Sequence, residues 1–251
     1  MTIEVTRRTA EELFPLHELF RAEANCQLIR DSYWTRGFLE AWALLIDGKT
    51  VGHAALGNRH FAGRVIEFFV LPEYRVQAAE LFAELLRASR ATHVEAQTNV
   101  PLMAAMVREF ATETRTESLL FAEEGPTALA APEDAVFRRK RETGDLGVFE
   151  HRMEPEGEWV IEAAGEIVGT GGFLPHYNPP YADLYMEVEE SKRRRGFGSY
   201  LIQELRRVCR EAGKCPAARC DVGNVASRRT LEKGGMIVCG ELVAGMVKSR
   251  K

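Results

Sequence analysis

A glycine-containing loop between two apolar segments most strongly constrains this chain. The loop, Arg193–Ser199, follows a segment that predicts a strand, Ala182–Val188, and leads into one that predicts a helix, Ser199–Ala212. The first backbone N–H groups of a helix have no partner inside it and lie at the positive end of its dipole. Because Gly196 and Gly198 lack a Cβ, the backbone can take a positive φ and approach a ligand closely. This order of elements predicts a binding site for an anion such as pyrophosphate.

The basic run Lys192–Arg195 also has other interpretations. By itself it would fit a solvated surface, a nuclear-import patch or a nucleic-acid contact. Its direct continuation into glycines and a helix favours phosphate binding, and the net charge of −4 argues against a general binder of polyanions. A second basic run, Arg138–Arg141, has acidic surroundings and no interleaved aromatic residues, so we expect no nucleic-acid partner.

The loop is similar to a family signature. The pattern Arg193-x-x-Gly196-x-Gly198 resembles the cofactor motif Gln/Arg-x-x-Gly-x-Gly/Ala of the GNAT acetyltransferase superfamily. The resemblance implies that acetyl-CoA is the acyl donor and that the acetyl group passes directly to an amine in a ternary complex. It also implies that two strands splay apart, so that the pantetheine arm of the donor adds to an open strand edge.

A second motif lies downstream in the family's order. Asn224-x-x-Ser227, followed by Leu-Glu-Lys-Gly-Gly-Met at 231–236, resembles the family's later cofactor-contacting helix and the strand after it. Two ordered motifs are much more specific than one. The resemblance covers the chain from Trp159 onward.

The resemblance assigns the donor contacts to three places. The end of the strand would offer backbone groups to the pantetheine arm and the thioester oxygen, the loop would hold the pyrophosphate, and the later helix would hydrogen-bond the arm. The cofactor-binding residues that we expect are Met186, Val188, Arg193, Arg194, Arg195, Gly196, Phe197, Gly198, Ser199, Asn224, Ser227 and Arg228.

The catalytic groups are less clearly marked. Many family members protonate the leaving thiolate with a tyrosine seven positions after the asparagine, but Leu231 stands there. Tyr185, and as alternatives Tyr181 and Tyr177, are our candidate acids. Asp183, Tyr185 and Glu187 alternate along the strand and project from one face. A carboxylate on a central strand is costly unless it is paired or functional, which makes Glu187 our candidate base and Asp183 the alternative. A Glu187 that is simply solvated at the strand end stays open.

The chain also contains an internal repeat. Residues 42–52 overlay residues 159–169 without a gap, and each copy predicts a β-hairpin. A strand, a helix and another strand follow each copy in the same order. We therefore expect an α+β fold made of two GNAT-like units, each a mixed, mostly antiparallel sheet flanked by helices in an α/β three-layer arrangement.

The first copy lacks the anion loop. The segment 75–80, Arg-Val-Gln-Ala-Ala-Glu, stands where the second copy has its arginines and glycines. A carboxylate at the mouth of an anion site repels phosphate. We therefore expect a degenerate GNAT-like domain at 1–130, which serves as a scaffold or substrate wall, and a GNAT domain with the acetyl-CoA site at 131–251.

Composition indicates a globular protein. Among the 251 residues, 45% are hydrophobic and 28% are charged, the first residues lack the profile of a signal peptide, and no apolar run approaches the roughly 20 residues of a membrane helix. We expect a cytoplasmic monomer or homodimer without a membrane partner.

Cysteine and histidine usage predicts no metal centre. His53, His60 and His176 show no ligand spacing, and no cysteine stands in a CxxC or Cys/His pair, so reduced thiols are expected. The cysteines are Cys26, Cys209, Cys215, Cys220 and Cys239.

The sequence favours an acetyl-CoA-dependent N-acyltransferase that acts on a primary amine of a small molecule or peptide. The acidic residues near the expected cleft, such as Asp183 and Glu187, favour a cationic amine. The alternative is a non-catalytic module that binds or senses acyl-CoA, because the family tyrosine is missing.

Overall fold

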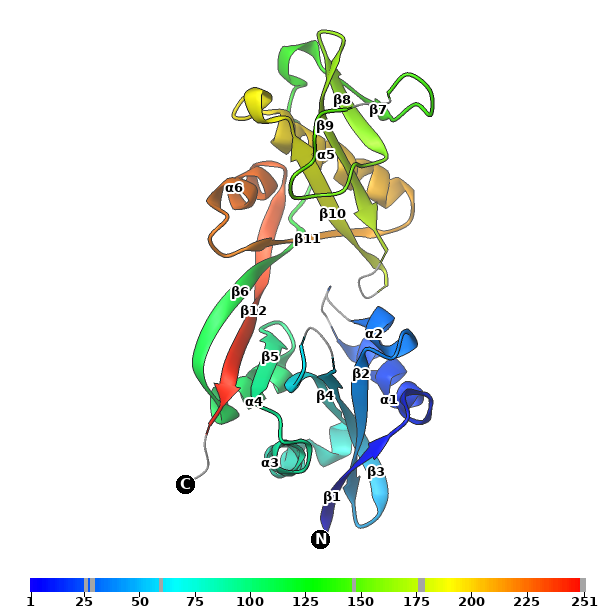
Figure 1. The fold of residues 1–251 in the computed structure, drawn as a ribbon, viewed down its shortest axis with the longest axis vertical. Coiled ribbons are helices and arrows are strands. Elements are labelled where there is room, and N and C mark those ends of the chain that lie inside the picture. Colours follow the sequence, from blue (N-terminus) through cyan, green and yellow to red (C-terminus); the bar gives the residue numbers. More distant parts are fainter. Residues whose placement is uncertain (25–26, 28–29, 59–60, 146–147, 176–178, 249–251) are drawn as a thin grey trace. The chain divides into compact units, whose positions relative to one another are not determined.

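The structure is a computed structural model that describes residues 1–251 apart from 25–26, 28–29, 59–60, 146–147, 176–178 and 249–251 (Figure 1). It contains two compact units: Met1–Ser118 with Gly240–Lys251, and Leu119–Cys239. The division falls inside two strands, β6 (Ala111–Glu123) and β12 (Met236–Val247), which therefore contribute to both units. The sequence placed this boundary at residue 130 and gave the whole C-terminal segment to the second unit.

The first unit is a mixed sheet with helices on both faces. Its elements are β1 (Ile3–Arg8), α1 (Ala10–Glu23), α2 (Asp31–Thr35), β2 (Leu39–Ile46), β3 (Lys49–Gly57), β4 (Arg64–Val70), the 3-10 helix η1 (Pro72–Gln77), α3 (Ala78–Ser89), β5 (His93–Gln97) and α4 (Pro101–Phe110). The strand order is β1-β2-β3-β4-β5-β12-β6. Neighbours from β1 to β4 are antiparallel, as are β5 and β12, whereas β4 and β5 are parallel.

The second unit repeats this plan. Its elements are β7 (Val136–Arg139), β8 (Trp159–Ala163), β9 (Glu166–Leu174), β10 (Tyr181–Val188), the 3-10 helices η2 (Pro132–Asp134) and η3 (Glu190–Lys192), α5 (Phe197–Glu211), β11 (Cys215–Asp221) and α6 (Val225–Lys233). The strand order is β12-β6-β11-β10-β9-β8-β7, and β10 and β11 form its parallel pair. The expected α+β architecture of mixed, mostly antiparallel sheets with flanking helices is confirmed.

Local sequence explains the start of α1. The Thr9 hydroxyl accepts the N–H of Glu12 at 3.3 Å, and the Glu12 carboxylate accepts the N–H of Thr9 at 2.8 Å. This reciprocal pair is a capping box, which satisfies two N–H groups at the helix start. Leu13, His17 and Phe20 recur at helical spacing and are buried against the sheet.

The two hairpins of the repeat agree in detail. Asp47 and Gly48 both have positive φ in the turn between β2 and β3, and Ala164 and Gly165 do so between β8 and β9. Two consecutive positive φ values match the right-handed twist of a hairpin. The register of each hairpin also shifts at the equivalent point, between residues 44 and 45 and between residues 161 and 162. The repeat predicted from the sequence is thus a repeat of backbone conformation.

A buried arginine holds the second unit together. Arg206 of α5 is 1% exposed, and its guanidinium donates to Glu123 Oε1 at 2.7 and 3.0 Å and to the carbonyl of Gly234 at 2.6 Å. It also donates to the Gly125 carbonyl and to Thr127 Oγ1. One side chain thus fixes the segment after β6 against the turn that follows α6.

Replacing this side chain should destabilise the protein strongly. Arg206→Met removes the donor of two carbonyls and two of the hydrogen bonds to Glu123, which keeps its ion pair with Arg210, so we expect a loss of about 3–5 kcal/mol in the free energy of unfolding. The matched control is Arg207→Met, which removes exposed pairs with Glu204 and Glu211 and should cost about 1 kcal/mol or less. Urea unfolding followed by fluorescence measures both values, and equal losses in the two variants would contradict this role of Arg206.

Candidate functional site

The strands β10 and β11 diverge in the middle of the second unit. Their described residues pair over three positions, from Tyr181 with Cys215 to Asp183 with Ala217. Beyond Asp183 the strand β10 continues to Val188 and keeps its antiparallel pairing with β9 on its other edge. The edge of β10 from residue 184 to 188 is therefore open to another extended chain.

The predicted anion loop lies at the end of this open edge. Gly196 has a φ of 93° and immediately precedes α5, and no described side chain caps the N-terminus of this helix. Arg194 also has a positive φ, 62°. The first N–H groups of α5 are thus available to a ligand at the positive end of the helix dipole. The helix start expected at Ser199 lies two residues earlier, at Phe197, which is buried.

Gly198, the second glycine of the loop, is required by packing. A Cβ at this position would lie 3.0 Å from Thr230 Cγ2 of α6 and 3.4 Å from Met186 Cε of β10. The absence of a side chain therefore lets α5 approach both elements. At the same site, Phe197 and Ser199 are buried, whereas Met186 is partly buried against the core of this unit.

Two of the three arginines of the loop, Arg193 and Arg195, already have partners. Arg193 Nε donates to the Val188 carbonyl at 3.0 Å, and its guanidinium lies 3.5 Å from Glu187 Oε1. Arg195 forms a bidentate ion pair with Glu133, which raises the pKa of this guanidinium. A phosphate would therefore compete with Glu133 for Arg195, while the loop amides need no such exchange.

The first unit keeps the arginine contact but not the loop. Arg75 Nε donates to the Val70 carbonyl at 3.1 Å, as Arg193 does to Val188. The 3-10 helix η1 then continues directly into α3 at Ala78, and the helix-preceding residue Gln77 has a negative φ. A helical turn thus occupies the place where the second unit opens its glycine loop.

The second motif forms the start of α6. Asn224 caps this helix, and its Oδ1 accepts the N–H of Ser227 at 3.0 Å. Arg228 Nε donates to Glu232 at 2.8 Å one turn later. Leu231, at the position of the family tyrosine, is buried in the core of the second unit and leaves no room there for a proton donor.

The candidate catalytic residues share one face of β10. Ala182, Leu184 and Val188 pack in the core with α5, so by alternation Asp183, Tyr185 and Glu187 project from the other face. Asp183 and Glu187 are buried, and Tyr185 is partly exposed.

Glu187 is fully engaged by backbone donors. Its Oε1 accepts the N–H of Arg152 at 3.1 Å, and its Oε2 accepts those of Met153 and Glu154, both at 3.1 Å. Burial raises the pKa of Glu187, but these N–H groups and the nearby His151 together lower it more. The carboxylate thus anchors the segment 152–154 against β10, and it is a weaker proton acceptor than a free carboxylate.

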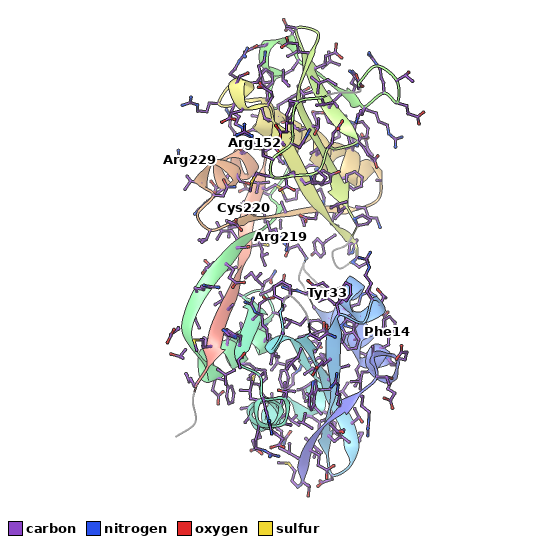
Figure 2. The ribbon with its side chains drawn as sticks, in the orientation of Figure 1. Phe14, Tyr33, Arg152, Arg219, Cys220 and Arg229 are labelled. Atoms are coloured by element: carbon purple, nitrogen blue, oxygen red, sulfur yellow. The ribbon has the colours of Figure 1, made fainter. Side chains whose placement is uncertain are left out.

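The segment before β8 is held at a second point. His151 Nε2 lies 2.6 Å from Thr170 Oγ1, which also accepts the N–H of Gly157 at 3.2 Å, and Thr170 is fully buried. A cavity of about 170 Å³ remains between this segment and the end of β10, lined in part by Phe149 and Arg193. Figure 2 labels Arg152 in this segment and Arg219 and Cys220 on β11.

Residues 118–236 match the model of the acetyltransferase (GNAT) family. This part of the chain belongs to the GNAT family. It contains β10, β11, the glycine loop and α6, which are the elements that the sequence motifs marked.

Solved structures extend the likeness to the whole chain. A GNAT-family acetyltransferase from Colwellia psychrerythraea aligns with a TM-score of 0.76 and 17% identity over 99% of this chain and 100% of that one. A tandem GNAT protein from the clavulanic acid biosynthesis pathway aligns with a TM-score of 0.57 and 14% identity over 100% of both chains. A GCN5-related N-acetyltransferase from Sphaerobacter thermophilus has a TM-score of 0.55 and 16% identity over 99% and 97%. At these low sequence identities the structural alignments show the fold alone. They confirm the expected tandem of GNAT-like units. No curated protein matches the sequence.

Outside the GNAT segment, the first unit contains a buried cluster that sequence spacing did not reveal. His17 Nδ1 and His53 Nε2 lie 2.8 and 2.6 Å from the same atom, Glu67 Oε1, while the Trp34 indole donates to Oε2 at 3.3 Å. The two histidines and Glu67 are the group of described residues whose ligand atoms lie close enough to hold a metal ion. The short contacts to one oxygen are those of a closed hydrogen-bonded set, which joins α1, β3 and β4.

Two of the described cysteines lack the environment of a nucleophile. Cys209 and Cys220 are buried, and burial raises the pKa of both thiols, that of Cys209 to about 11. Cys215 is exposed, and the Cys239 thiol donates to the Leu120 carbonyl at 3.5 Å. The expectations for Cys26, His60, His176 and Tyr177 concern positions outside the described residues. No helix among the described residues is long and apolar enough to cross a membrane.

The Glu67 cluster should make the free energy of unfolding depend on pH in the acid range. Burial raises the pKa of Glu67, but the hydrogen bonds and charges of His17 and His53 lower it to about 2 from 4.5. The carboxylate therefore stabilises the fold fully above pH 4.5, and this contribution is lost as the pH falls toward 2. We expect Glu67→Gln to be less stable than the wild type near neutral pH, with a gap that narrows in acid. Urea midpoints across this range measure the gap, and Glu80→Gln, an exposed position, is the control. A gap independent of pH would contradict this account.

Proposed function

We propose that the second unit is an acetyl-CoA-dependent N-acyltransferase, which moves an acetyl group to a primary amine of a small molecule or peptide in a ternary complex. The observation that carries the proposal is the open edge of β10 beyond Asp183, which a short segment with the 3-10 helix η3 connects to an uncapped helix start at Gly196. An extended ligand with amides at one end and phosphates at the other matches this sequence of backbone groups. The family membership of residues 118–236 supports acyl transfer in general.

The residues present fit the donor. The amides of Gly196, Gly198 and Ser199 would bind its pyrophosphate, together with Arg193, Arg194 and Arg195 beside Phe197. Backbone groups near Met186 and Val188 would hold the pantetheine arm and the thioester oxygen, and Asn224, Ser227 and Arg228 would contact the donor from α6. When bound, acetyl-CoA supplies the acetyl group as a reactive thioester. Most of these contributions are positional, so proximity would provide much of the acceleration.

The acidic residues on and beside β10 favour a positively charged acceptor. Burial, and then the charges of Asp183 and Glu187 on β10, raise the pKa of Glu154. Burial, and then the charge of Glu158, raise the pKa of Tyr185. Acidic groups gathered on one face create a negative potential that attracts ammonium groups. We therefore expect the acceptor to be a positively charged amine.

The alternative function is a non-catalytic acyl-CoA-binding or sensing module. The buried Leu231 favours it, because this position provides the thiolate with no proton donor. Release of free thiol from acetyl-CoA in the presence of an amine panel separates the two functions, since a sensor binds the donor without consuming it.

A donor-binding measurement tests the site itself. We expect isothermal titration calorimetry to give about one acetyl-CoA per chain, with binding lost or badly weakened in Gly196→Glu and Gly198→Glu, because a carboxylate would enter the anion loop. Val76→Glu is the matched control, since Val76 is exposed in the equivalent segment of the first unit and should leave binding unchanged. Two equivalent sites, or unaltered affinity in both glycine variants, would overturn this assignment.

A further inference from the structure

The parallel strands of the first unit also diverge, and a cavity lies between them. The described residues of β4 and β5 pair over two positions, 64–65 with 93–94 (Figure 1). Beyond this point β4 keeps its antiparallel pairing with β3 as far as Val70. A cavity of about 30 Å³ begins directly after the last pair and is lined in part by residues 66–68 of β4 and 95–97 of β5.

A larger cavity adjoins the first one. It has a volume of about 400 Å³ and lies between the end of α1, the end of β4 and the start of α4. Phe20, Phe68 and Val100 line both cavities, and Phe69 and Leu102 add to the apolar wall of the larger one. Sites for small molecules typically have volumes of about 300–1,000 Å³ and mainly apolar walls. The larger cavity has both properties.

Arg30 lines the smaller cavity and has a donor without a partner. Its side chain is 13% exposed, and its Nη2 donates to Glu95 Oε1. The guanidinium carbon lies over the Phe61 ring, 4.4 Å from the ring centroid. The other terminal nitrogen, Nη1, is buried and has no hydrogen-bond partner among the described residues. Because a buried N–H group without a partner is costly, this cavity favours a ligand that brings a hydrogen-bond acceptor.

The acidic side chains of the smaller cavity are already engaged. Glu95 accepts from Arg30 at Oε1 and from Arg64 at Oε2, the latter at 2.6 Å. Glu67 Oε1 lies within hydrogen-bond distance of two histidine nitrogens, and its Oε2 accepts the Trp34 indole N–H. A cationic ligand has to compete with these donors for either carboxylate. An anionic ligand meets the unpaired Nη1 of Arg30 instead.

From these contacts we propose that the first unit binds a small molecule with a carboxylate on an apolar body. The carboxylate lies at Arg30, and the body fills the larger cavity. The smaller cavity has room for about two water-sized atoms, which matches the two oxygens of a carboxylate. A hydrogen bond between two charged groups is roughly twice as strong as a neutral one, which favours a carboxylate over an amide. This site belongs to the first unit alone and does not depend on acyl transfer in the second.

The larger cavity does not suit a ligand with phosphate groups. Arg75, which lines it, pairs with Glu23, and the helical turn of η1 continues into α3 without a glycine loop. The backbone N–H groups that would hold a pyrophosphate are therefore used inside the helix. A simple carboxylate needs no such loop.

Calorimetric titration of the full chain tests the class of ligand with three probes of similar shape: phenylacetate, phenylacetamide and phenethylamine. We expect phenylacetate to bind with a Kd on the order of 1 mM or below, the neutral amide to bind about tenfold more weakly, and the amine to bind more weakly still. Preferential binding of the amine would show that Glu67 and Glu95 dominate, and it would overturn the proposal. A cavity that holds only water would give no binding of phenylacetate, which would overturn it equally.

Two variants test the position of the ligand. Arg30→Met removes the free donor and should weaken phenylacetate binding by about tenfold or more, whereas Arg36→Met, at an exposed position, should not. Val100→Phe keeps Arg30 but fills space that both cavities share, so it decides the question if Arg30→Met does not fold. Val76→Phe, at another exposed position, is its control. Unchanged affinity in Val100→Phe would contradict the proposal.

An NMR measurement locates the probe and separates this inference from the proposed function. Trp34 lines the smaller cavity, so its indole N–H signal should shift when phenylacetate is added, while that of Trp159 in the second unit should not. A shift at Trp159 with none at Trp34 would place the probe elsewhere and defeat the inference. A chain that binds phenylacetate in this way but does not bind acetyl-CoA would defeat the proposed function and leave the inference standing.

Discussion

The early end of the pairing between β10 and β11 is the constraint on which the candidate site depends. A continued parallel ladder would consume the backbone groups of β10 from Leu184 to Val188, but the recorded pairs stop at Asp183 and Ala217. A short segment that contains the 3-10 helix η3 then connects the open edge to Gly196 and the uncapped start of α5. Strand edge and helix dipole thus form one polar surface made of backbone, which needs no particular side chain to bind an extended, phosphate-bearing ligand.

The two units show how one fold can keep its framework and lose this surface. In both, an arginine after the strand donates to the last carbonyl of that strand, from Arg75 to Val70 and from Arg193 to Val188. The next few residues differ. A helical turn runs into α3 in the first unit, whereas positive φ values at Arg194 and Gly196 open the loop in the second. Glycine placement therefore explains why the second copy opens a loop where the first copy continues as a helix.

The sequence predicted what is local or periodic. The glycine loop, the hairpins and the alternation along β10 depend on residues close together in the chain, and each was predicted from the pattern. The partners of Glu187 and of Glu67 could not be predicted in this way, because Arg152 lies 35 positions from Glu187 and His17 lies 50 positions from Glu67. The unit to which the last strand belongs also depends on distant residues, since residues 242–246 of β12 pair with β5 of the first unit.

Hydrogen–deuterium exchange of the full chain with and without acetyl-CoA tests the central claim most directly, because it reads the backbone groups themselves. The account predicts that acetyl-CoA protects amides at 186–188 and 196–199 in the second unit, while the equivalent segment 75–80 of the first unit exchanges at an unchanged rate. Protection at 75–80, or binding that leaves the amides of 196–199 unprotected, would contradict the account.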